Sequence, residues 1–83
     1  MLCLGLDVHS KWMTIRGFDL QTGEEVYLKR VSNESESVRE TFSSLNGPIR
    51  AVMESGTNSW AMYRELLPYC GRFRVLERSR HFW

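Results

Sequence analysis

The sequence predicts an α/β domain in which three strands are followed by a helix, a strand, a second helix and a last strand. Residues 2–8 (LCLGLDV) are apolar apart from one glycine and one carboxylate, which is typical of a central strand with parallel neighbours and two buried faces. The two β-rich segments that follow are joined only by short polar turns, as in an antiparallel meander. Apolar residues at helical spacing then lie on either side of residues 49–53.

Length and composition limit what the chain can be. Its 83 residues make one small domain, which buries only roughly 60–65% of its unfolded surface. The sequence is 42% hydrophobic and 25% charged with a net charge of +1, as in an ordinary soluble globular protein. From residue 64 onward the arginines outnumber the acids; a solvated basic segment is expected, with a nucleic-acid contact as the alternative. These arginines are Arg64, Arg72, Arg74, Arg78 and Arg80.

The two cysteines, Cys3 and Cys70, lie in apolar surroundings without a second cysteine or a histidine at zinc spacing. We therefore expect buried free thiols, as in a reducing compartment. The first apolar run is too short for a signal peptide and lacks a basic segment before it. No stretch is long enough to cross a membrane, so a cytoplasmic location is expected.

The first three strands are predicted at residues 2–8, 12–18 and 24–31. Residues 12–18 (WMTIRGF) are rich in β-formers, and residues 24–31 (EEVYLKRV) alternate enough to have one face in water. Gly23 lies in the turn between them, where a positive φ is needed. The short connections predict that the three strands run antiparallel to one another.

The first helix is predicted to begin at Asn33, a good N-cap residue, with Glu36 three positions later completing a capping box. Gly47 is expected at the C′ position, and Pro48 prevents the helix from continuing. The residues expected to face the core recur at positions i, i+4 and i+7: Val38, Phe42 and Leu45.

A fourth strand at residues 49–53 is followed by Glu54, just as the first strand ends on Asp7. A second helix is predicted over residues 59–69, with Thr57 and Asn58 as its cap. Its buried stripe is expected to be Trp60, Tyr63 and Leu67, with Met62 and Leu66 beside it. A fifth strand follows at residues 72–76.

The chain order predicts that Asp7 and Glu54 meet. A strand–helix–strand connection makes strands three and four parallel, and such a crossover is right-handed. If strand four pairs with strand one, the sheet order is 3-2-1-4-5 and both acids lie at the same edge of a mixed five-stranded sheet. Adjacent carboxylates repel unless a cation lies between them, and Mg²⁺ is the preferred ion for oxygen ligands. Taken singly, each acid is an ordinary strand-terminal residue, and His9 is expected to be a surface residue rather than a ligand.

This arrangement is similar to the ribonuclease H-like fold, and two motifs make the resemblance specific. Residues 5–11 (GLDVHSK) resemble the G-[IL]-D-V-S-K opening of the DEDD transposases of the insertion-sequence 110 family. Residues 53–60 (MESGTNSW), followed by Tyr63 and a Leu-Leu pair, resemble that family's second motif. The resemblance to this family extends from residue 2 to about residue 77, and it includes both motifs at this spacing.

The resemblance implies that residues 1–77 are the N-terminal portion of a RuvC-like catalytic domain, with residues 78–83 as an irregular tail. It implies that Asp7 and Glu54 are the first two acidic ligands of a Mg²⁺ site. It also implies metal-dependent phosphodiester cleavage and strand transfer in the full-length enzyme. The partners implied are DNA and, for the full-length family, a guide RNA.

The family also has a D-x-x-D arrangement on a later helix and a C-terminal domain with a nucleophilic serine. This sequence has no aspartate after Asp19, so we expect a truncated domain that does not cleave DNA by itself. Two alternatives stay open. One is a non-catalytic remnant that forms a homodimer, covering its sheet edge and its Trp83 end. The other is a lobe of an actin-like ATPase such as a sugar kinase, although the glycines typical of such proteins after the aspartate are absent from residues 8–11 (VHSK).

Overall fold

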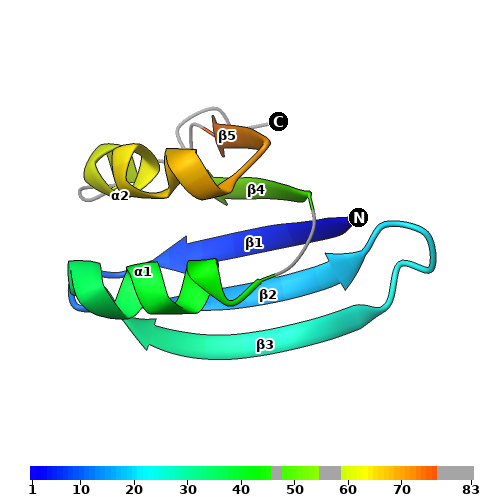
Figure 1. Cartoon of the computed structure of the whole chain (residues 1–83), viewed down its shortest axis with the longest axis horizontal. Coiled ribbons are helices and arrows are strands. Elements are labelled where there is room, and N and C mark those ends of the chain that lie inside the picture. The colour runs from blue at the N-terminus through cyan, green and yellow to red at the C-terminus, as the bar shows by residue number, and fades with distance from the viewer. Residues whose placement is uncertain (46–47, 55–58, 77–83) are drawn as a thin grey trace, which may run out of the picture.

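The structure is a computed structural model that describes residues 1–45, 48–54 and 59–76. Its element order confirms the α/β prediction, and each strand begins and ends within about one residue of its predicted bounds. The elements shown in Figure 1 are β1 (Leu2–Val8), β2 (Trp12–Asp19), β3 (Glu25–Ser32), α1 (Ser35–Ser43), β4 (Ile49–Glu54), α2 (Ser59–Leu66), the 3-10 turn η1 (Leu67–Tyr69) and β5 (Arg72–Leu76).

The five strands form one mixed sheet in the order β3-β2-β1-β4-β5, as predicted. β1, β2 and β3 are antiparallel neighbours, whereas β4 runs parallel to both β1 and β5. Gly23 has the positive φ expected of it, at 75°. The first and fourth strands are therefore direct neighbours running in the same direction (Figure 1).

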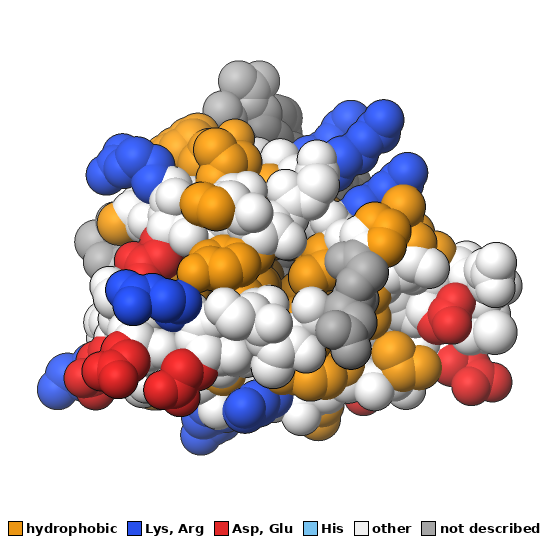
Figure 2. All heavy atoms as spheres, in the orientation of Figure 1, with side chains coloured by type: hydrophobic (Ala, Val, Ile, Leu, Met, Phe, Trp, Pro, Cys, Tyr) orange, Lys and Arg blue, Asp and Glu red, His pale blue; other side chains and the backbone are white. Residues whose placement is uncertain are grey.

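Both helices pack on the same face of the sheet (Figure 1), so the core is a single layer between helices and strands. Alternate strand residues point into it, and the buried set is Leu4, Leu6, Met13, Ile15, Val31, Val38, Phe42, Ile49, Ala51, Met53, Met62, Leu66 and Cys70. On this side of the molecule, apolar side chains lie across the middle, between the helices, and charged ones lie around the margin (Figure 2).

The prediction that β1 is buried on both faces is wrong. Leu4 and Leu6 are buried, but Asp7 is exposed and Gly5 only half-buried. Successive residues of a strand point to opposite faces, and in the described part of the chain helices cover only one of them. We call the uncovered side the open face of the sheet.

Helix α1 begins after Glu34, so the predicted N-cap at Asn33 is wrong. The Asn33 side-chain amide instead donates hydrogen bonds to the carbonyls of His9 (2.5 Å) and Trp12 (3.3 Å). It therefore fastens the turn between β1 and β2 rather than capping the helix. Val38 and Phe42 are buried as predicted, and the expected C′ residue, Gly47, lies outside the described residues.

Helix α2 is shorter than predicted, because it gives way to the 3-10 turn at Leu67. Pro68 lies in that turn and has no N–H to donate to the residue four positions earlier. The predicted buried stripe is also wrong in part: Trp60 and Leu67 are 59% and 46% exposed, whereas Met62 and Leu66 are buried. Tyr63 is partly buried, and the expected caps at 57 and 58 lie outside the described residues.

Where the structure describes the chain, it contains no helix with the length and apolar character needed to cross a membrane.

Candidate carboxylate site

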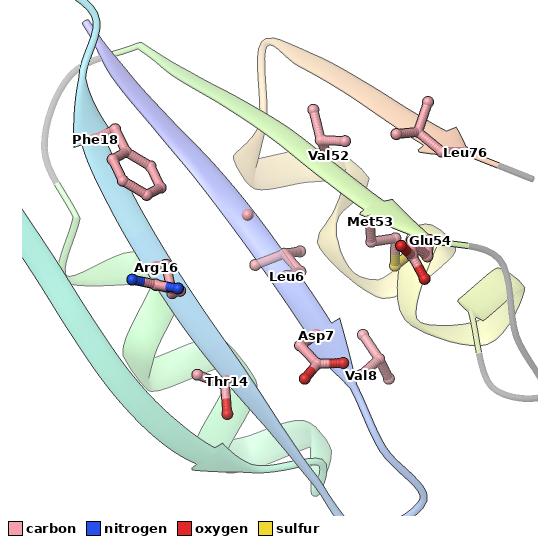
Figure 3. Close-up of a pocket in the computed structure, with 11 residues that line it drawn as sticks. Leu6, Asp7, Val8, Thr14, Arg16, Phe18, Val52, Met53, Glu54 and Leu76 are labelled. Atoms are coloured by element: carbon pink, nitrogen blue, oxygen red, sulfur yellow. The ribbon is translucent and has the colours of Figure 1, made fainter. Parts of the chain in front are cut away.

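The strand register places Asp7 beside Glu54. Leu6 of β1 lies opposite Met53 of β4, and both side chains point into the core. The next residue on each strand therefore points to the open face, at the carboxyl ends of two parallel neighbours that lie ~4.8 Å apart. Figure 3 shows the two carboxylates at these adjacent strand ends, on the side away from the helices.

Both acids line a shallow hollow of about 560 Å³ on the open face. Gly5 leaves room in this hollow, because a Cβ at its position would lie 3.9 Å from the nearest atom, the Arg16 carbonyl oxygen. The side chains drawn around the hollow in Figure 3 include Thr14, Arg16, Phe18, Val52 and Leu76. The site is therefore open to a ligand that approaches from above the sheet.

His9 contacts the Asp7 carboxylate, a contact that the sequence did not indicate. His9 Nε2 lies 3.0 Å from Asp7 Oδ2, and since a carboxylate only accepts hydrogen bonds, Nε2 carries the hydrogen. The imidazole lies against the Trp12 ring, with centroids 4.0 Å apart. The side chains of His9 and Asp7 are 44% and 67% exposed, so His9 is at the surface as predicted but is also part of the site.

Arginines gather on the same open face. Arg50 of β4 lies opposite Arg72 of β5, and Val52 lies opposite Arg74, so these three arginines share a face with Glu54. Arg16 of β2 is on this face too, and within residues 1–45, 48–54 and 59–76 it alone of the arginines forms an ion pair, with Glu25 at 2.7 Å.

The sequence interpretation treated Arg72 and Arg74 as part of a solvated basic segment. Both are exposed, as that interpretation requires, but they lie within the sheet and on the face that carries the carboxylates. Arg72 and Arg74 are two positions apart in a predicted strand, and this spacing could have placed both side chains on the same face of the sheet.

Two carboxylates on neighbouring strands are a donor set of the kind that Mg²⁺ takes. Mg²⁺ is commonly held by one or two protein carboxylates, with waters and substrate phosphates completing an octahedron. Asp7 and Glu54 supply that number of carboxylates from neighbouring strands. Across the part of the chain that the structure describes, no group of three or more His, Cys, Asp or Glu side chains is placed to hold a metal. The remaining ligands of a cation here would be oxygens from water or substrate.

The fold and this site define an α/β protein with a pair of acids at the carboxyl ends of adjacent central strands. Comparisons with protein-family models, curated proteins and solved structures give no match for this chain.

Proposed function

We propose that residues 1–77 form the N-terminal portion of a ribonuclease H-like, RuvC-like catalytic domain of a DNA transposase, in which Asp7 and Glu54 bind Mg²⁺. The observation that carries this proposal is the register of β1 and β4, which makes these acids neighbours on one face. The resemblance of residues 5–11 and 53–60 to the insertion-sequence 110 family supports the reaction class.

In the proposed full-length enzyme, these two acids would serve phosphodiester cleavage and strand transfer, and the 83-residue chain by itself is expected not to cleave DNA. Mg²⁺ bound there would supply Lewis acidity at a phosphate oxygen. Asp7 and Glu54 would hold the ion from two neighbouring strands, and the exposed hollow that they line would leave room for a phosphate on the open face. The proposed partners are DNA and, by resemblance alone, a guide RNA in the full-length protein.

The arginines of the open face support a polyanionic substrate. Arg50 and Arg72 are register partners on adjacent strands, where like charges destabilise a sheet. No acid within the described ranges forms an ion pair with either of them. A phosphate backbone crossing the open face would neutralise these charges while reaching the two carboxylates.

Calorimetric titration with Mg²⁺ and Mn²⁺ tests the metal site. We expect the Asp7→Asn and Glu54→Gln variants each to lose the cation that the wild-type chain binds. Glu40→Gln removes the same charge from an exposed position on α1, behind the sheet, and should bind as the wild type does. Equal binding by all four proteins, or no binding by the wild type, would overturn the proposal.

A second candidate function, homodimerisation, is favoured by the edge strand β3. Its residues Val26 and Leu28 are 57% and 62% exposed, and an edge strand offers unpaired backbone groups to another copy. Light scattering over a range of concentrations tests this candidate. A dimer that Leu28→Lys dissociates supports it, and a monomer at all concentrations contradicts it.

A further inference from the structure

Arg30 on β3 leads to an inference that rests on the proposed function and makes it more specific. We propose that Arg30 binds the phosphate that follows, along a nucleic-acid strand, the one at the two carboxylates. The strand then crosses the open face from β1 and β4 toward β3. Its neighbouring phosphates lie at the metal site and at Arg30.

The strand register places Arg30 in one row with the carboxylates. Asp7 of β1 lies opposite Thr14 of β2, and Thr14 lies opposite Arg30 of β3. Residues opposite one another share a face of the sheet. Figure 3 shows the Thr14 and Asp7 side chains on the open side, and Val31, which follows Arg30, is buried in the core. Two strand spacings of ~5 Å place the Arg30 backbone ~10 Å from that of Asp7.

The Arg30 guanidinium is held at this end of the sheet by Trp12. Its Cζ lies 4.1 Å from the centroid of the Trp12 ring. The same ring lies 4.0 Å from the imidazole of His9, and His9 Nε2 is 3.0 Å from Asp7 Oδ2. Side-chain contacts thus lead from Arg30 to Asp7, and the guanidinium lies at the same end of the sheet as the carboxylates.

The guanidinium has donors available for an anion. The Arg30 side chain is exposed, and within the described ranges the acids in ion pairs are bound to His9 and Arg16 instead. The N–H donors of a guanidinium lie in its plane, so stacking over an indole leaves them accessible, and their fork matches a phosphate. Contact with Trp12 also limits the side-chain freedom that binding would otherwise cost.

The position of Arg30 suits the second phosphate rather than the first. A phosphate that contacts the metal lies over β1 and β4, two strands from Arg30. The next phosphate is one nucleoside away and receives no charge from the cation directly. Without a positive group of its own, it would be repelled by the nearby carboxylates. Arg30 supplies that charge at the β3 side of the same row.

A pair of nucleotides tests the second phosphate. Thymidine 3′,5′-bisphosphate carries two phosphates on one nucleoside, and thymidine 5′-monophosphate carries one. In calorimetric titrations with Mg²⁺ present, we expect the wild type to bind the bisphosphate about three- to tenfold more tightly, as for one exposed hydrogen bond. Arg30→Gln should abolish this preference and leave the affinity for the monophosphate unchanged.

Lys29→Gln is the matched control. It removes the same charge from the preceding exposed residue of β3, which lies opposite the buried Ile15 and therefore points to the other face of the sheet. This variant should keep the wild-type preference for the bisphosphate.

A preference that persists in Arg30→Gln, or that Lys29→Gln lowers equally, would overturn the inference. Equal affinity of the wild type for the two nucleotides would do the same. The proposed function fails separately. It is contradicted if Mg²⁺ does not strengthen binding of the monophosphate to the wild type, or if Asp7→Asn leaves the effect of Mg²⁺ unchanged.

Discussion

Gly17 lies where β2 passes close to its neighbours, and a side chain there has no room. A Cβ at this position would lie 2.8 Å from Tyr27 Cβ and 3.2 Å from the side chains of both Leu2 and Leu4. We expect Gly17→Ala to lower the free energy of unfolding by about 1–3 kcal/mol, the cost of overpacking. Gly5→Ala adds the same methyl group 3.9 Å from its nearest neighbour and should change stability by less than about 0.5 kcal/mol. Urea denaturation measures both free energies of unfolding. Equal losses in Gly17→Ala and Gly5→Ala would contradict the close packing at Gly17.

Cys70 gives the chain a defined response to alkaline pH. Burial raises the pKa of the Cys70 thiol from 9.0 to about 11. The unfolded chain therefore loses this proton near pH 9 and the folded chain near pH 11, so rising pH favours the unfolded state between those values. Below pH 9 both states keep the proton and the effect is absent.

We predict that the wild-type chain loses stability from pH 9 to 11 more steeply than Cys70→Ala, measured by urea denaturation at each pH. Because burial also raises the pKa of the Tyr27 hydroxyl from 10.0, some loss should persist in the variant. If the free energy of unfolding fell equally with pH in the wild type and in Cys70→Ala, folding would not raise the pKa of the Cys70 thiol.

At the scale of elements, Asn33 connects the end of β3 to the turn after β1 through side-chain hydrogen bonds. Its amide faces two carbonyl oxygens, those of His9 and Trp12, so the donor is what matters. Asp is as good an N-cap as Asn, but a carboxylate at this position would repel both carbonyls. We expect Asn33→Asp to lower the free energy of unfolding by about 1–3 kcal/mol. Wild-type stability of this variant in thermal denaturation would support a helix cap instead.

The elements themselves were predictable because each carries a local signal. Strand bounds followed from β-rich segments and turn residues such as Gly23, and the first helix from the spacing of Val38 and Phe42. The buried side of α2 was not predictable from its pattern, since apolar residues occur on two adjacent stripes. Packing against the sheet selected Met62 and Leu66 and left Trp60 exposed.

At the scale of the whole molecule, the open face combines acids with arginines. We expect the double variant Arg50→Gln/Arg72→Gln to bind duplex DNA several-fold more weakly. The slope of log affinity against log salt should become shallower by about 0.9 for each phosphate that the variant no longer neutralises. Arg39→Gln/Arg64→Gln removes the same charge from exposed helix positions behind the sheet and should bind as the wild type does. Fluorescence anisotropy measures the DNA affinity of both double variants. An equal loss of affinity in the two would contradict a DNA interface on the open face.

The candidate site was predictable as far as topology alone determines it. Asp7 and Glu54 end two apolar strands, and the rules for strand–helix–strand connections predict that these strands run in the same direction. The pairing of the first strand with the fourth was an assumption, which the strand order confirms. The contact of His9 with Asp7 was not predictable, because it depends on the turn that Asn33 holds from a distant strand. The pairing of Arg50 with Arg72 likewise depends on the β4–β5 register, which no local pattern specifies.

The central claim is that the neighbouring ends of β1 and β4 share one cation, and paramagnetic Mn²⁺ tests it most directly. In two-dimensional amide NMR spectra, substoichiometric Mn²⁺ should broaden the signals of Asp7 and Glu54 together. The signal of Thr22, in the distant turn between β2 and β3, should stay sharp. Broadening of only one of the two acids, or broadening centred elsewhere in the chain, would contradict the claim.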